Sequence, residues 1–144
     1  MDNANKIKLA GIEPTESGKK ISFASYLKRD YVDKSLVIYL DRTGIIEKIY
    51  FSSNSYGTVE WINGAGLKNC HTWESEDEAK SHNYLSKRYT AILSDGAAAP
   101  DYARTRIIPD ILDYMDDADS AEWISDILNV REYLVPVDVS RFGP

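Results

Sequence analysis

Two runs of β-branched and aromatic residues, separated by only four residues, constrain the fold of this chain more than any other feature. The runs are residues 35–40 (SLVIYL) and 45–51 (IIEKIYF), and both compositions are typical of strands. The connection 41–44 (DRTG) ends in glycine, which tolerates a left-handed backbone conformation. The pattern therefore predicts a β-hairpin whose left-handed residue is Gly44.

A third strand is predicted directly after this hairpin. The turn-forming residues 54–57 (NSYG) lead into residues 58–62 (TVEWI). Side chains alternate between the two faces of a strand, so Val59 and Trp61 are expected to share one face. The three strands together predict an antiparallel meander over residues 35–62.

Three helices are predicted after the meander. Ser75 and Glu78 form a capping box for a helix that runs to about Tyr89. Asp119 and Glu122 form a D-x-x-E start for the last helix. Apolar residues three and four apart define the buried stripes of the second and third helices: Ile108, Ile111, Leu112 and Met115, followed by Ile124, Ile127 and Leu128.

These elements predict an α+β fold, a small antiparallel β-meander (about 35–62) packed against about three helices. Terminal strands are an optional extension of the sheet, and residues 133–139 predict one that, because of Pro136, lies at an edge or is irregular. A chain of 144 residues suits one domain, so residues 1–144 are expected to form a single unit. That unit includes a loosely structured N-terminal segment, 1–20, and an internal loop, 94–101.

The acidic charge of the chain is concentrated in its last third. Of the 17 basic and 23 acidic residues, residues 1–90 hold 13 and 12, a net charge of +1. Residues 91–144 hold 4 arginines, no lysine and 11 acidic residues, a net charge of −7. Binding of nucleic acid requires a basic surface, so this region is not expected to contact nucleic acid directly. A basic protein is the partner that such a charge distribution favours.

Helical geometry places many of these carboxylates together, opposite the apolar stripes. Asp110, Asp113 and Asp117 fall within about 60° of one another on a helix. Like charges at this spacing destabilise a helix by roughly 0.2–0.5 kcal/mol per pair, and no lysine intervenes to offset that cost. We therefore expect a partner-binding surface with the following members: Asp110, Asp113, Tyr114, Asp116, Asp117, Asp119, Glu122 and Asp126.

A surface of this kind imitates the phosphates of a nucleic acid. The expected function is that of a non-enzymatic, acidic inhibitor that occludes the basic, nucleic-acid-binding groove of a partner protein. In small size and acidity the chain is similar to phage anti-defence proteins of the anti-CRISPR or anti-restriction type, and to toxin-immunity proteins. Three alternatives stay open: a merely solubilising acidic face, a small enzyme with a carboxylate and tyrosine acid-base set, and a structural subunit of a larger assembly. A homodimer is also left open.

No residue pattern predicts a cofactor or a metal. Cys70, His71 and His82 match no zinc spacing, and adjacent residues of an extended segment point to opposite faces, which separates Cys70 from His71. One cysteine forms no internal disulfide, and no apolar run reaches the roughly 18 residues of a membrane span. The start of the chain lacks the pattern of a secretory signal. The protein is therefore expected in the cytoplasm, without contact to a membrane.

Overall fold

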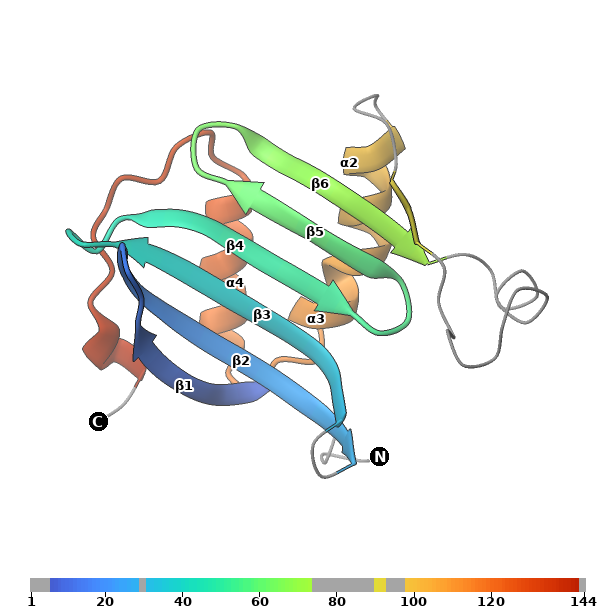
Figure 1. Ribbon diagram of the computed structural model, residues 1–144, viewed down its shortest axis with the longest axis horizontal. Helices are drawn as coiled ribbons and strands as arrows, with labels where there is room; N and C mark the ends of the chain where they lie inside the picture. The colour runs from blue at the N-terminus through green and yellow to red at the C-terminus, as the bar shows by residue number, and fades with distance from the viewer. Residues whose placement is uncertain (1–5, 29–30, 74–89, 93–97, 143–144) are drawn as a thin grey trace.

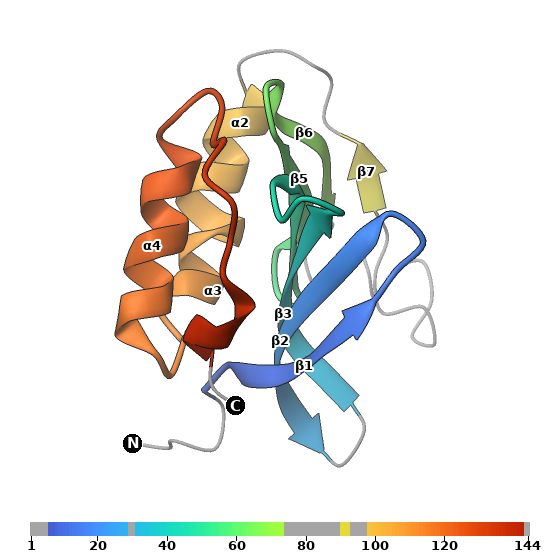
Figure 2. The ribbon, with the colours of Figure 1, turned by 90° about the vertical axis from the view of Figure 1, so that its left-hand side faces the viewer.

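The protein folds into two layers, a β-sheet and a helical layer that packs against one face of it (Figures 1 and 2). The computed structural model describes residues 6–28, 31–73, 90–92 and 98–142. Seven strands form one antiparallel sheet in chain order, from β1 to β7. Their bounds are β1 Lys8–Pro14, β2 Gly18–Lys28, β3 Tyr31–Asp41, β4 Ile46–Ser53, β5 Gly57–Ile62, β6 Gly66–Trp73 and β7 Thr90–Ile92.

The prediction of a small meander packed against about three helices is wrong. The predicted strands exist as β3, β4 and β5, but they form the centre of a much larger sheet. The sheet gains β1 and β2 before the meander and β6 and β7 after it. The predicted helix at 75–89 lies outside the described residues. The sheet is therefore the dominant element of the fold, and the described helices form one thin layer on it (Figure 2).

Alternation of burial along the central strands fixes which face of the sheet is covered. Along β5, Gly57, Val59 and Trp61 are buried, whereas the residues between them are partly exposed. The predicted shared face of Val59 and Trp61 is confirmed, and so is the left-handed conformation of Gly44, whose φ is 90°. A one-residue slip would move every apolar side chain to the wrong face, so this alternation specifies the register of the sheet.

The helical layer contains one bent helical segment and one straight helix. The bent segment consists of α2 (Ala98–Tyr102), a π-helical turn at Ala103–Ile107 and α3 (Pro109–Leu112). Its bend has a covalent cause, because Pro109 has no N–H to continue an α-helical ladder. The amide of Ile108 donates instead to the carbonyl of Ala103. This wider turn leaves two successive isoleucines, Ile107 and Ile108, buried against the sheet.

The straight helix, α4 (Ala118–Leu128), packs beside α3 in the same layer (Figure 2). Its buried residues are Ser120, Ile124 and Ile127, which recur every three or four positions. Two of the three belong to the apolar stripe expected from the sequence. The opposite side of α4 therefore faces away from the sheet.

The segment 133–139, predicted as a strand that lies at an edge or is irregular, forms no strand of the sheet and is irregular. Residues 129–138 form an irregular strap, followed by a short 3-10 helix at Val139–Phe142. Backbone amides hold the strap against turns of the sheet: Gly64 donates to the carbonyl of Arg131, and Val137 donates to that of Gly44. Proline at 136 lacks the donor that a ladder requires at that position.

Ile7, just before β1, is tied to the helical layer. Residues 8–14, within the segment expected to be loosely structured, form the edge strand β1. Just before it, the amide of Ile7 donates to the carbonyl of Tyr114, and the amide of Asp116 donates to the carbonyl of Ile7. Ile7 is 1% exposed and belongs to the core.

Substitution of Gly57 tests the close approach of β5 to β6. Gly57 has a φ of 135°, and a Cβ there would collide with the backbone carbonyl of His71. We expect Gly57→Ala to lower the free energy of unfolding by about 2–4 kcal/mol, since strain and overpacking add. Gly11→Ala is the matched control, because a Cβ at that position meets nothing within 4 Å. Urea denaturation measures both variants, and equal stabilities would contradict the proposed strand packing.

Candidate protein-binding surface

The exposed side of α4 carries three carboxylates in one row. Asp119, Glu122 and Asp126 are exposed and lie three and four residues apart, opposite the buried isoleucines of the same helix. With a rise of about 1.5 Å per residue, the row extends over roughly 10 Å. Asp113 and Asp116, in the connection from α3 to α4, are exposed as well. These five residues are called the acidic surface below.

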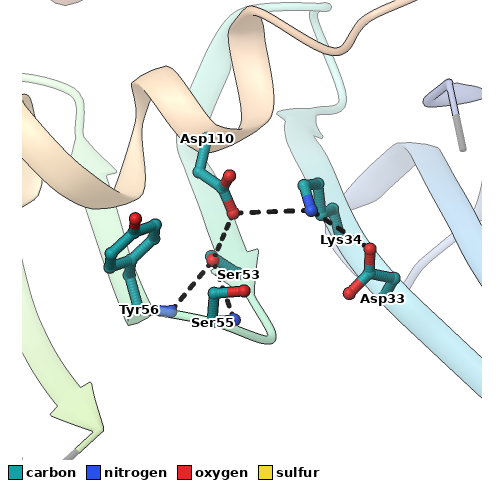
Figure 3. Close-up of polar contacts among 6 residues, drawn as sticks. All are labelled: Asp33, Lys34, Ser53, Ser55, Tyr56 and Asp110. Atoms are coloured by element: carbon teal, nitrogen blue, oxygen red, sulfur yellow. Dashed lines mark hydrogen bonds and ion pairs between the residues drawn. The ribbon is translucent and has the colours of Figure 1, made fainter. Parts of the chain in front are cut away.

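Asp110, predicted to belong to the binding surface, is instead held in a buried polar network (Figure 3). Its carboxylate Oδ2 accepts a hydrogen bond of 2.6 Å from the hydroxyl of Ser53 on β4. The same oxygen lies 3.6 Å from the ammonium of Lys34 on β3. The Asp110 side chain is only 15% exposed. It therefore connects α3 to the sheet and is not available to a partner.

The lysine of this network is fully paired within the protein. The Nζ of Lys34 donates to Oδ2 of Asp33 at 3.1 Å, in addition to its ion pair with Asp110. It also lies 4.9 Å from the centre of the Tyr114 ring, in a cation–π arrangement. Tyr114 is 43% exposed, so one part of its ring packs on Lys34 and another part faces solvent. No spacing rule relates position 34 to position 110, so the sequence held no signal for this network.

Ser53 cannot serve as a nucleophile in this arrangement. It is 0% exposed, and its hydroxyl oxygen accepts from the amides of Ser55 and Tyr56 at 3.2 and 3.1 Å (Figure 3). Its proton is donated to Asp110. The hydroxyl thus closes the turn between β4 and β5 and links that turn to α3. The network is an element of tertiary structure, which no substrate reaches.

Asp117 is the N-cap of α4. Its carboxylate accepts from the amide of Asp119 at 3.1 Å and from the hydroxyl of Ser120 at 2.7 Å. The hydrogen bond from Ser120 is the largest cause of a lowered pKa at Asp117. The expected helix start at Asp119 and Glu122 is therefore displaced, because the cap lies two residues earlier. Asp117 is exposed, but its hydrogen bonds are used by the helix end.

The structure thus divides the eight predicted binding residues into three groups. Asp110 and Asp117 stabilise the fold, and Tyr114 lies at the boundary between the buried network and solvent. Among the described residues, no lysine or arginine nitrogen lies within 4.0 Å of a carboxylate of the acidic surface, whose members are Asp113, Asp116, Asp119, Glu122 and Asp126.

On the sheet, unlike on the acidic surface, some charged side chains form ion pairs with one another. Lys48 on β4 lies 3.0 Å from Glu60 on β5, and this hydrogen bond raises the pKa of Lys48. Lys48 also packs over the ring of Tyr39 at 5.0 Å. At the edge of the sheet, Lys20 lies 3.6 Å from Glu13. The sheet therefore pairs two of its carboxylates with lysines, whereas the carboxylates of the acidic surface have no such partner among the described residues.

The described residues contain no arrangement for nucleophilic or metal chemistry. Cys70 is buried, and burial raises the pKa of its thiol. His71 is on the opposite face of β6, with its Nδ1 3.0 Å from the carbonyl of Asn69, so the predicted separation from Cys70 is confirmed. His82 lies outside the described residues. Within the described ranges, no group of three or more His, Cys, Asp or Glu side chains is placed to hold a metal ion.

Comparison with known proteins gives no relative: no family model, no curated protein and no solved structure matches the chain. None of the helices in the described part of the chain is long and apolar enough to cross a bilayer. The assignment of a function therefore depends on the geometry and charge of this chain alone.

Replacement of Asp110 tests its role in the fold. Asp110→Asn removes a charge that faces buried Lys34 and weakens the hydrogen bond from Ser53. We expect a loss of about 2–3 kcal/mol in the free energy of unfolding, because a buried charge loses part of its compensation. Asp113→Asn, three residues along and exposed, should change stability by less than about 0.5 kcal/mol. Equal losses in chemical denaturation would show that Asp110 is an ordinary surface residue.

The cap at Asp117 makes a pH-dependent contribution to stability. Its pKa in the folded protein is lowered below the ordinary value of 3.8, so the folded state binds fewer protons than the unfolded state. The contribution is complete above pH 3.8 and is lost as the pH falls through the lower, folded pKa. Asp117→Asn keeps a good cap without the charge, so we expect unfolding midpoints that fall less steeply below pH 3.8. Asp116→Asn, at an exposed neighbour without these bonds, should retain the wild-type slope.

Proposed function

We propose that the protein is a non-enzymatic inhibitor whose acidic surface occludes a basic, nucleic-acid-handling surface of a partner protein. In this proposal it acts in the cytoplasm, as an inhibitor of the phage anti-defence type (anti-CRISPR or anti-restriction) or of the toxin-immunity type. The partner supplies arginine and lysine side chains that pair with the carboxylates of Asp113, Asp116, Asp119, Glu122 and Asp126. The protein thereby takes the place of a nucleic acid on the partner.

One observation carries the proposal: no described lysine or arginine pairs with a carboxylate of the acidic surface, although the same chain pairs two carboxylates with lysines on the sheet. A surface that serves solubility alone is best made of mixed charges, which avoid repulsion between neighbours. The sheet follows this rule with its Lys48–Glu60 and Lys20–Glu13 pairs. In the helical layer, Arg141 packs over Trp123 of α4 at 4.4 Å but forms no ion pair with a carboxylate of the acidic surface. An arginine or lysine at an exposed position of α4 would lower the repulsion between these carboxylates. In the proposed complex, a basic partner supplies the positive charges that compensate these carboxylates.

The two layers also differ in overall charge. The described sheet residues 6–28 and 31–73 contain nine basic and six acidic side chains, a net charge of +3. Residues 98–142, which include the helical layer and the strap, contain four basic and ten acidic side chains, a net charge of −6. This difference in charge between the layers favours an encounter in which the helical layer faces the basic partner, and it accelerates association at low salt. It also disfavours direct binding of nucleic acid on that side.

Partly exposed apolar side chains beside the carboxylates favour a protein partner over a small cation. Tyr114, between Asp113 and Asp116 in the chain, is 43% exposed, and Val130 just after α4 is 42% exposed. Tyrosine is enriched at the energetically important centres of protein interfaces, where it buries a large area at low entropic cost. The proposed interface combines these contacts with the ion pairs.

The experiment that tests this function is capture followed by competition. The tagged protein is used to isolate binding proteins from its host at low salt, and duplex DNA is then titrated onto the complex. We expect a nucleic-acid-binding protein that is released by the DNA and by high salt. The triple variant Asp113→Asn, Asp116→Asn and Asp119→Asn should weaken capture by about tenfold or more at low salt, since each substitution removes an exposed carboxylate that steers association.

The matched control removes the same number of charges from the sheet layer. Glu13→Gln, Glu16→Gln and Glu47→Gln are exposed substitutions far along the chain from the acidic surface. This variant should capture the partner nearly as well as the wild type. If both variants weaken capture of the partner equally, the effect depends on net charge alone and not on the acidic surface. If the partner stays bound in excess DNA, the protein does not occlude its nucleic-acid-binding surface. Asp110 and Asp117 are left unchanged, because they stabilise the fold.

A further inference from the structure

Leu134 and Val135, two neighbouring residues of the strap, are the most exposed large apolar side chains among the described residues. They are 63% and 59% exposed, whereas no other large apolar residue in the described part of the chain exceeds 44%. Pro136, the next residue, is exposed as well. Single exposed apolar side chains are ordinary on a protein surface, but a contiguous group of them is a feature of interaction sites. Residues 134–136 are called the apolar segment below.

Hydrogen bonds on both sides hold the apolar segment in place. Before it, the amide of Tyr133 donates to Oδ1 of Asn63 at 2.9 Å, and the side-chain amide of Asn63 donates to the carbonyl of Tyr133 at 2.8 Å. After it, the amide of Val137 donates to the carbonyl of Gly44 at 2.8 Å. Both partners lie in turns of the sheet. The segment is therefore ordered before any partner binds, which lowers the entropic cost of binding.

The apolar segment itself contributes no contact to the fold that would explain its composition. Tyr133 and Val137, on either side, are partly buried and pack against the core, but Leu134 and Val135 do not. Neither of these two residues forms a hydrogen bond within the described ranges of the chain. The fold thus positions two apolar side chains firmly and leaves them in solvent.

The strap borders the acidic surface through Trp123 of α4. The indole nitrogen of Trp123 donates to the hydroxyl of Tyr133 at 3.2 Å, and the two rings meet edge to face with their centres 6.4 Å apart. Asp119 and Asp126 are four residues before and three residues after Trp123, so they lie on the same side of α4 as this indole. The strap runs beside α4 (Figure 2). The carboxylates and the apolar segment therefore adjoin one another.

The charge of α4 alone is too sparse to displace a nucleic acid. Duplex DNA carries about one negative charge per 1.7 Å of its axis, which gives about six charges over the roughly 10 Å that the acidic row of α4 spans. That row holds three carboxylates, Asp119, Glu122 and Asp126. Exposed ion pairs also contribute little net binding energy. An inhibitor that competes with DNA therefore needs a further contact that DNA cannot make.

We propose that Leu134 and Val135 supply this contact, by insertion into an apolar depression that borders the basic surface of the same partner protein. The inference rests on the proposed function and names the apolar part of its interface. The acidic surface steers the partner to the protein, which sets the rate of association. Burial of the two apolar side chains slows dissociation.

The experiment compares binding kinetics of variants of the full chain. The partner protein isolated by the capture experiment is immobilised, and association and dissociation are followed at low and high salt. The double variant Leu134→Ser and Val135→Ser should raise the dissociation rate constant about tenfold or more, with an association rate constant within about twofold of the wild type. The acidic triple variant should show the opposite pattern, a slower association that depends less on salt.

The matched control removes an exposed apolar pair from the sheet. Tyr26 on β2 and Val32 on β3 stand opposite each other and are 44% and 43% exposed. Tyr26→Ser with Val32→Ser should leave the dissociation rate constant unchanged. Urea denaturation shows that each variant is folded, and the variant of the apolar segment should unfold at the wild-type midpoint, because its side chains belong to no core.

The outcomes separate this inference from the function on which it rests. If the variant of the apolar segment dissociates like the wild type while the acidic triple variant still associates slowly, the inference is overturned and the proposed function stands. If no partner is captured that DNA releases, both are overturned. Sedimentation of the protein alone provides a further check: a dimer that Leu134→Ser with Val135→Ser dissociates would show that the apolar segment binds a second copy of this chain, contrary to the proposal.

Discussion

Burial of a single face of the sheet is the constraint on which the rest of this structure depends. Along the central strands, buried side chains alternate with partly exposed ones, so the sheet has one face to cover, and the helical layer covers it (Figure 2). Ile107, Ile111 and Ile124 are 0% exposed against that face. Because the apolar sides of the helices are committed to the core, their acidic sides must point to solvent. The acidic surface is therefore a consequence of how the two layers pack.

Polar contacts determine where the layers meet. The Lys34–Asp110–Ser53 network joins β3 and β4 to α3, and the hydrogen bonds of Ile7 join the residue before β1 to the connection that follows α3. Buried ion pairs contribute modest net stability, but the loss of one partner is costly, which makes such contacts specific to one arrangement. This specificity matters for the proposed function, because it gives α3 and the connection that carries Asp113 and Asp116 a fixed position relative to the sheet.

Local patterns predicted local structure, and long-range contacts were not predictable. The Gly44 turn and the shared face of Val59 and Trp61 follow from chain chemistry and strand periodicity, and both were predicted correctly. The extent of the sheet was missed, because β1 and β2 are rich in lysine, serine and glycine and gain stability only from pairing. The proline-containing segment at 133–139 has the composition of a strand but no partner to pair with. Asp110 was misassigned, since its partners are distant in the sequence.

The acidic surface is the central element of the functional account, and amide hydrogen exchange tests it most directly. The exchange of the protein is measured alone and in complex with the partner that it captures. The account predicts additional protection in residues 113–130, from the carboxylates after α3 to the end of α4, with little change in the central strands β3, β4 and β5. Protection concentrated on those strands, with α4 exchanging as in the free protein, would show that the partner binds the uncovered face of the sheet and would contradict the account.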